Sequence, residues 1–169
     1  RLMLPTPAAG PDLRLAGLHG PKGWSNQVSY AVGTLPECTE AEPNDTPEQA
    51  QQVALPVVVN GRVERPGDVD VLRISGQRGG KIVAEVYGRR LNSPLDSVLR
   101  VTDAAGKVVA WNDDHVEKDG FLHKDEVGLV THHADSYLTA TLPGDGVYLV
   151  QLTDAQGQGG PAWGYRLRI

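Results

Sequence analysis

The stretch Lys81-Ile82-Val83-Ala84-Glu85-Val86-Tyr87 decides the fold, because its side chains alternate between two faces. Ile82, Ala84 and Val86 would share one face of an extended chain, since successive side chains of a strand point to opposite sides. The stretch from Asp70 to Ser75 repeats the pattern, with Leu72 and Ile74 on one face. Both stretches predict β-strands with one apolar face.

Eight short runs of this kind follow residue 55, separated by turns that contain glycine or aspartate. They cover residues 57–63, 70–75, 81–87, 97–102, 107–111, 136–142, 147–153 and 165–169. The fourth and fifth runs are joined by Asp103-Ala104-Ala105-Gly106, in which the Asp side chain can accept from backbone amides and the Gly tolerates a positive φ. The runs predict an all-β protein, an eight-stranded antiparallel β-sandwich of jelly-roll type. One core is expected from Leu72, Ile74, Ile82, Val86, Leu99, Val101, Leu138, Leu152 and Leu167.

The sequence has one helix signal and one unusual segment. Thr46 can cap a helix whose first position is Pro47, so one short helix is expected from Thr46 to about Gln52. Residues 1–36 hold only two candidate strands, Leu13 to Leu18 and Gln27 to Val32, and cannot close a core alone. They either add edge strands to the sandwich of residues 37–169 or form the tail of a preceding domain.

Charge and composition exclude several classes of function. The 169 residues carry a net charge of -5, which disfavours a nucleic-acid partner because phosphate binding needs a basic face. No apolar run approaches the ~20 residues that cross a bilayer, so we expect no membrane association. The single cysteine, Cys38, excludes an internal disulfide and any zinc site built from several thiolates. The chain begins with Arg1, and we expect it to be part of a longer protein.

The densest chemical signal is Glu37-Cys38-Thr39-Glu40-Ala41-Glu42-Pro43-Asn44-Asp45. In an extended chain Glu40, Glu42 and Asn44 point the same way, and Asp45 follows at once. Calcium takes six to eight oxygen ligands, so a second segment must contribute, and Gly67-Asp68-Val69-Asp70 offers two more carboxylates. A solvated acidic linker is the alternative, because runs of charge usually face water.

These motifs, taken in order, carry a resemblance to a known family. Glu40 to Thr46, Asn60-Gly61, Gly67 to Asp70, Asn112-Asp113-Asp114 and Pro143 to Tyr148 look like the bacterial pre-peptidase C-terminal domain, which includes the collagen-binding modules of clostridial collagenases. The resemblance runs from about Glu37 to Ile169. It implies a jelly-roll sandwich in secreted bacterial proteins and a calcium site at Glu40, Glu42, Asn44 and Asp45, with Asp68 and Asp70 as further ligands. Residues 25–36 also resemble the closing strand of an immunoglobulin-like domain found before such modules.

A second group of oxygen donors lies on three later turns. It comprises Asp96, Asn112, Asp113, Asp114 and Asp135. Antiparallel strands could bring these turns to one end of the sandwich, which gives a second candidate cation site. Ordinary turn chemistry is the alternative, because Asn and Asp cap loops by bonding their own backbone.

The sequence does not favour an enzyme. Four of the five histidines lie at 115, 123, 132 and 133, and solvent-exposed loop histidines are the preferred interpretation over a transition-metal site. His133, Asp135 and Ser136 supply the residue types of a hydrolase triad, but neither a nucleophile elbow nor an oxyanion loop accompanies them.

Two aromatic residues, Trp163 and Tyr165, follow a glycine-rich turn and are candidate ligand-binding rings. We therefore expect a non-catalytic, calcium-stabilised accessory module, monomeric and extracellular, that binds a polysaccharide or collagen-like polymer or positions a neighbouring domain. A purely structural spacer is the alternative. Exposure of the two rings would favour polymer binding, and their burial would favour the spacer.

Overall fold

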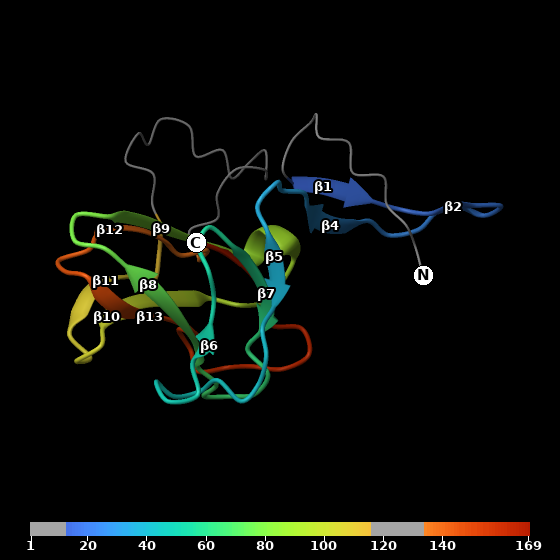
Figure 1. Cartoon of the computed structure of the whole chain (residues 1–169). Coiled ribbons are helices and arrows are strands. Elements are labelled where there is room, and N and C mark those ends of the chain that lie inside the picture. The colour runs from blue at the N-terminus through green and yellow to red at the C-terminus, as the bar shows by residue number, and fades with distance from the viewer. Residues whose placement is uncertain (1–12, 116–133) are drawn as a thin grey trace.

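The computed structural model describes residues 13–115 and 134–169. Ten strands form two five-stranded sheets that face each other (Figure 1). The first sheet, in spatial order, contains β11 (Val108–Asn112), β10 (Ser97–Asp103), β13 (Gly146–Asp154), β8 (Asp70–Gly76) and β6 (Gln51–Gln52). The second contains β12 (Tyr137–Thr141), β9 (Lys81–Tyr87), β14 (Gly164–Arg168), β7 (Val58–Arg62) and β5 (Glu37–Thr39). The predicted all-β sandwich is confirmed.

The strand pairing is that of a jelly roll. All eight predicted strands are present, and they pair antiparallel in nested order: β7 with β14, β8 with β13, β9 with β12 and β10 with β11. Two further antiparallel pairs, β9 with β14 and β10 with β13, complete the sheets. The β10–β11 turn forms as expected, with Asp103 Oδ1 accepting from the amides of Ala105 and Lys107 at 2.9 Å and Gly106 at a φ of 81°.

The core lies between the two sheets and contains all nine residues predicted for it. Because side chains alternate along each strand, the inward positions of one sheet meet those of the other. Leu72, Ile74 and Leu99 from the first sheet are fully buried, as are Val86 and Leu167 from the second. The period-two pattern of the sequence therefore specifies both the strands and their buried faces.

Three short elements differ from expectation. The helix expected from Thr46 to about Gln52 is not formed: the Gln49 amide donates to the Thr46 carbonyl in a single turn, and the chain then extends as β6. Pairing of Gln51 with Leu72 of β8 overrides the local helix signal. The short helical element is instead η1 (Arg89–Leu91). Both β5 and β6 pair in parallel with their neighbours, so the sandwich is not purely antiparallel.

The N-terminal segment forms small sheets of its own. The strands β1 (Leu13–Ala16) and β4 (Val28–Ala31) pair with each other, and β2 (His19–Gly20) pairs with β3 (Gly23–Trp24). These strands extend away from the sandwich in Figure 1. One contact to the sandwich is a 3.0 Å hydrogen bond that Asn92 Nδ2 donates to Ser29 Oγ. The assignment of residues 1–36 to the end of an immunoglobulin-like domain remains a prediction.

Two further observations complete the fold. Within the described residues, no helix is long and apolar enough to cross a membrane. Of the four predicted loop histidines, only His115 lies in the described ranges, where its ring centroid is 4.8 Å from that of Tyr137. His123, His132 and His133 lie outside them.

Candidate cation site

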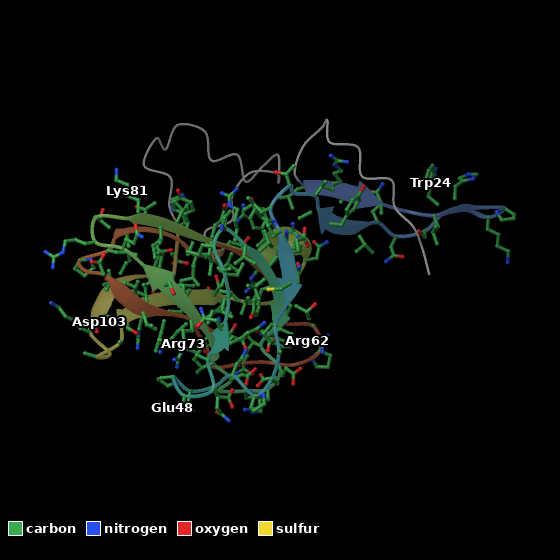
Figure 2. All side chains as sticks on the ribbon, in the orientation of Figure 1. Trp24, Glu48, Arg62, Arg73, Lys81 and Asp103 are labelled. Carbon is green, nitrogen blue, oxygen red and sulfur yellow. The ribbon has the colours of Figure 1, made fainter. Side chains whose placement is uncertain are left out.

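Two chain segments bring acidic side chains together at one end of the sandwich. The first is residues 40–45, which leave β5, and the second is the start of β8 with the turn before it. Parallel pairing of β5 with β7 fixes the first segment, and a 2.9 Å bond from the Glu40 amide to the Asn60 carbonyl extends that pairing. The six residues predicted for the first cation site come from these two segments. Figure 2 shows the described side chains on the ribbon, with Glu48 and Arg62, which neighbour these segments in the sequence, labelled.

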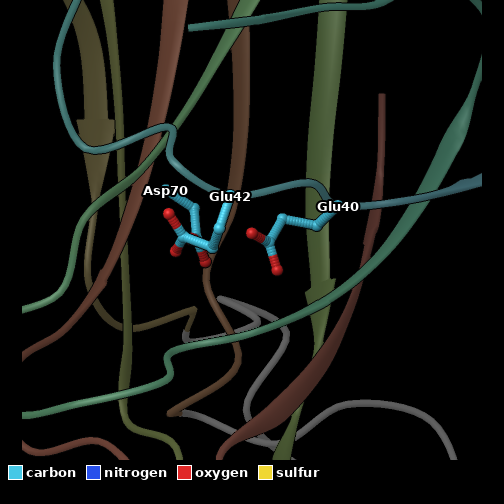
Figure 3. A group of neighbouring side chains, drawn as sticks. All are labelled: Glu40, Glu42 and Asp70. Carbon is cyan, nitrogen blue, oxygen red and sulfur yellow. The ribbon is translucent and has the colours of Figure 1, made fainter. Parts of the chain in front are cut away.

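Glu40, Glu42 and Asp70 form what we call the inner cluster (Figure 3). One carboxylate oxygen from each lies within 4.8 Å of the other two. Asp70 is only 1% exposed, and neither of its carboxylate oxygens has a hydrogen-bond partner. A buried, unpartnered carboxylate beside two others is unfavourable unless a cation or a proton neutralises it.

Asn44 joins the acidic segment to β8. It is completely buried; its carbonyl accepts from the Val71 amide at 3.1 Å, and its Nδ2 donates to Glu40 Oε1 at 3.0 Å. Its own amide donates to Glu42 Oε2 at 3.0 Å. The side-chain oxygen Oδ1 is buried without a partner. Asn44 thus orients two carboxylates and leaves one neutral oxygen free to serve as a ligand.

Glu42, Asp45 and Asp68 form the outer cluster, which shares Glu42 with the inner one. Asp68 is buried, and its Oδ2 accepts a 2.6 Å hydrogen bond from the Glu64 amide. Arg65 reaches this cluster, with its Nη2 2.5 Å from Asp45 Oδ2 and 3.4 Å from Asp68 Oδ1. The outer cluster therefore already has one positive group beside it.

The electrostatics of the inner cluster follow from burial and mutual repulsion. Burial, reinforced by the charge of Glu40, raises the pKa of Asp70 to about 8. Burial also raises the pKa of Glu40, Glu42 and Asp68, and neighbouring carboxylates add to each rise. These directions mean that the ionised cluster is unfavourable by itself, which is the condition that a bound cation relieves.

Tyr165 forms one wall of the inner cluster, a role that the sequence did not reveal. The residue is 4% exposed, and its hydroxyl is buried without a hydrogen-bond partner. Burial, and the nearby charge of Asp70, raise the pKa of this phenol well above its ordinary value. Gly61 makes the approach possible, because a Cβ there would clash with the Tyr165 ring and lie 2.8 Å from Glu40 Cβ. The Asn60-Gly61 pair is the feature of the sequence that could have indicated this close approach.

Trp163 lies partly buried against the core, and its indole nitrogen is buried. Tyr165 is thus buried, and Trp163 is half-buried. The exposed tryptophans are Trp24, at 72%, and Trp111, at 60%.

The second predicted group has contacts of a different kind from the first. In the described part of the chain, its acids do not form a set of three carboxylates close enough to share an ion. Asp135 instead accepts from the amides of Gly88 and Arg89, at 2.9 and 2.7 Å, and from Arg90 Nε at 2.8 Å. Asn112 Oδ1 accepts from the Tyr137 amide, and its Nδ2 donates to the Asp114 carbonyl.

Of the remaining members, Asp113 and Asp114 are exposed, and Asp96 is half-buried. Asp113 Oδ1 accepts from the Asp114 amide, and the Asp96 amide donates to Asp154 Oδ2. Asn112 and Asp113 thus make local hydrogen bonds, and Asp135 forms a buried ion pair with Arg90.

The first site fits a hard divalent cation. Its donors are five carboxylates and one amide oxygen, all oxygen ligands of the kind that calcium prefers. Neither histidine nor cysteine belongs to either cluster. The buried, unpartnered oxygens of Asp70 and Asn44 are the observation that distinguishes this set from a solvated acidic surface.

Comparison with known proteins places the fold. No family model matches the chain. The chain is 31% identical over 115 residues to a probable subtilase-type serine protease of Deinococcus radiodurans; the match covers 66% of this chain and 14% of that protein. The pre-peptidase C-terminal domain of a Bacillus anthracis collagenase superposes with a TM-score of 0.50 and 12% identity, over 74% of this chain and 98% of that domain. The chain thus contains a β-sandwich with the fold of a bacterial pre-peptidase C-terminal domain, as the resemblance in its sequence implies.

Proposed function

We propose that this chain is a non-catalytic accessory module of a secreted bacterial protein, monomeric by itself and stabilised by calcium bound at residues 40–45, Asp68 and Asp70. The observation that carries the proposal is Asp70, a fully buried carboxylate without a partner that faces Glu40 and Glu42. The subtilase-type relative and the collagenase domain support a setting beside a protease domain.

The position of the site suggests what the cation does. Residues 40–45 directly follow β5, which is the first strand of the sandwich in the chain. Asp68 lies in the turn before β8, and Asp70 is the first residue of β8. A cation bound by residues 40–45 and by these two aspartates would hold residues 40–45 against β8. Glu37 at the start of β5 is also held, by two contacts of 2.7 and 2.8 Å from the Arg166 guanidinium. Such a module would fix the direction from which a preceding domain joins it.

Positioning a neighbouring domain is therefore the first candidate role, and polymer binding is the second. Burial of Tyr165 and partial burial of Trp163 count against polymer binding at these two rings, because a stacking platform needs an exposed ring, and they equally favour a purely structural spacer. Binding of a polysaccharide or collagen-like polymer would use Trp111 instead, which pairs across the strands with the exposed Arg100.

Calcium titration by isothermal calorimetry tests the site. We expect saturable calcium binding to the wild-type chain and a loss of at least about tenfold in affinity for Asp70→Asn, which removes a charged ligand. Glu48→Gln is the matched control, because Glu48 is an exposed acid three residues after Asp45 that belongs to neither cluster. Equal affinity in all three proteins, or no binding to the wild type, would contradict the proposal.

A further inference from the structure

Arg65 is a basic partner of the outer cluster. Its guanidinium pairs with Asp45 and lies 3.4 Å from Asp68, two of the three acids of the outer cluster. In the described part of the chain, no lysine or arginine side chain forms an ion pair with Glu40, Glu42 or Asp70. The two clusters share Glu42 and have similar ligands, yet only one of them has a basic partner.

The backbone of Arg65 is fixed, whereas its side chain is free to leave. The Arg65 carbonyl accepts from the Asp68 amide at 3.1 Å, and Gly159 packs so closely that a Cβ there would clash with the Arg65 backbone. The Gly67 amide also donates to the Gly157 carbonyl at 3.1 Å. The Arg65 side chain, by contrast, is 56% exposed. A rotation of this side chain into solvent needs no change in the fold.

We propose that Arg65 is a tethered counter-ion of the outer cluster, and that a divalent cation binds there only by displacing the guanidinium. The inference rests on the proposed function, since it assumes that the neighbouring inner cluster binds calcium. The inner cluster has no such competitor, so it fills first, and the outer cluster fills at higher calcium concentration. Arg65 thereby sets the difference in affinity between two adjoining sites.

The reason is electrostatic. The guanidinium and a divalent cation would lie beside the same carboxylates, and their mutual repulsion opposes simultaneous occupancy. Displacement exchanges one positive charge for two, and the cation must first overcome the existing ion pair with Asp45. Removal of the Arg65 charge therefore strengthens cation binding at the outer cluster. The same change leaves the cation-free cluster with more uncompensated negative charge, which destabilises the cation-free protein.

The test compares calcium titrations of the wild type, Arg65→Gln and Arg62→Gln by isothermal calorimetry. Arg62 is the matched control, because it is an exposed arginine next to the site, on β7, and its side chain belongs to no ion pair in the described residues. We expect two binding steps in the wild type, and a weaker step that becomes at least about tenfold tighter in Arg65→Gln. Arg62→Gln should leave both steps within about twofold of the wild type.

A second measurement, thermal unfolding, distinguishes a folding defect of Arg65→Gln from the predicted change in its calcium affinity. In chelator, Arg65→Gln should melt below the wild type, and in saturating calcium the two melting temperatures should converge. Arg65→Lys keeps the charge and should resemble the wild type in the titration. If the wild type binds calcium but Arg65→Gln shows the same affinities, the role of Arg65 is wrong while the calcium site stands. If none of the proteins binds calcium, the proposed function fails as well.

Discussion

Asp70 combines complete burial with two carboxylate oxygens that have no hydrogen-bond partner. Buried charges in folded proteins are usually paired or bound to a metal. A proton can neutralise Asp70, as its raised pKa shows, and a cation can do so while keeping the neighbouring acids ionised. Ionised Asp70 should therefore destabilise the cation-free protein and, as a ligand, stabilise the cation-bound protein.

The substitution Asp70→Asn should therefore have opposite effects in the two states. In chelator at pH 8, loss of the unfavourable charge should raise the free energy of unfolding by about 1 kcal/mol, which corresponds to a few degrees in melting temperature. In calcium, the variant should melt below the wild type, because one charged ligand is missing. Thermal unfolding followed by circular dichroism measures both. A variant that is destabilised in both conditions would show that Asp70 serves packing alone.

The carboxylates predicted for the first site lie close together in the structure, whereas the described acids of the second group do not form such a set. Glu40, Glu42 and Asn44 alternate in an extended chain, which predicts that their oxygens share one side, and Asp45 is the next residue along the chain. Asp135 could not be interpreted in the same way, because its partner Arg90 lies 45 residues earlier, and only the fold reveals the pair.

At the scale of elements, alternation predicted the long strands and failed for the short ones. β8, β9 and β10 each span seven residues, enough for a period of two to be visible. β5 has three residues and β6 has two, which is too few for an alternating pattern to be visible. Each forms by pairing with a neighbouring strand, β5 with β7 and β6 with β8. These two short strands flank the acidic segment and hold it in place.

An ion pair between Glu37 and Arg166 adds to the backbone pairing that attaches β5 to β7. The hydrogen bond that the Arg166 guanidinium donates to the Glu37 carboxylate is the main cause that lowers the pKa of Glu37 from 4.5. A lowered pKa in the folded state contributes stability above the ordinary pKa, and that stability is lost as the pH falls through the lowered value. Because the Glu37 side chain is 41% exposed, solvent screening limits the contribution to less than about 1 kcal/mol.

Glu37→Gln should accordingly lower the free energy of unfolding slightly at pH 7. The difference from the wild type should shrink as the pH falls from 4.5 through the lowered pKa of Glu37, because the folded wild-type glutamate then also becomes protonated. Urea denaturation in chelator across this range measures the effect, and Glu48→Gln serves as the exposed, unpaired control. A difference that persists unchanged at the acidic end would show that hydrogen bonding, rather than charge, holds β5.

At the scale of the whole molecule, the nested pairing of eight strands places the first and last of them, β7 and β14, side by side. Tyr165 of β14 and Gly61 of β7 therefore meet directly beneath the acidic segment. The same strand pair therefore closes the jelly roll and supports the acidic segment. Binding of a ligand to the folded state alone raises the free energy of unfolding, so calcium should stabilise the entire sandwich.

Thermal unfolding of the wild type in millimolar calcium and in chelator tests this central claim most directly. We predict a single cooperative transition whose melting temperature rises by several degrees in calcium and falls back when chelator is added. Glu42→Ala, which removes the carboxylate shared by both clusters, should reduce that shift, whereas Glu48→Gln should retain it in full. Identical melting curves of the wild type with calcium and with chelator would contradict the account.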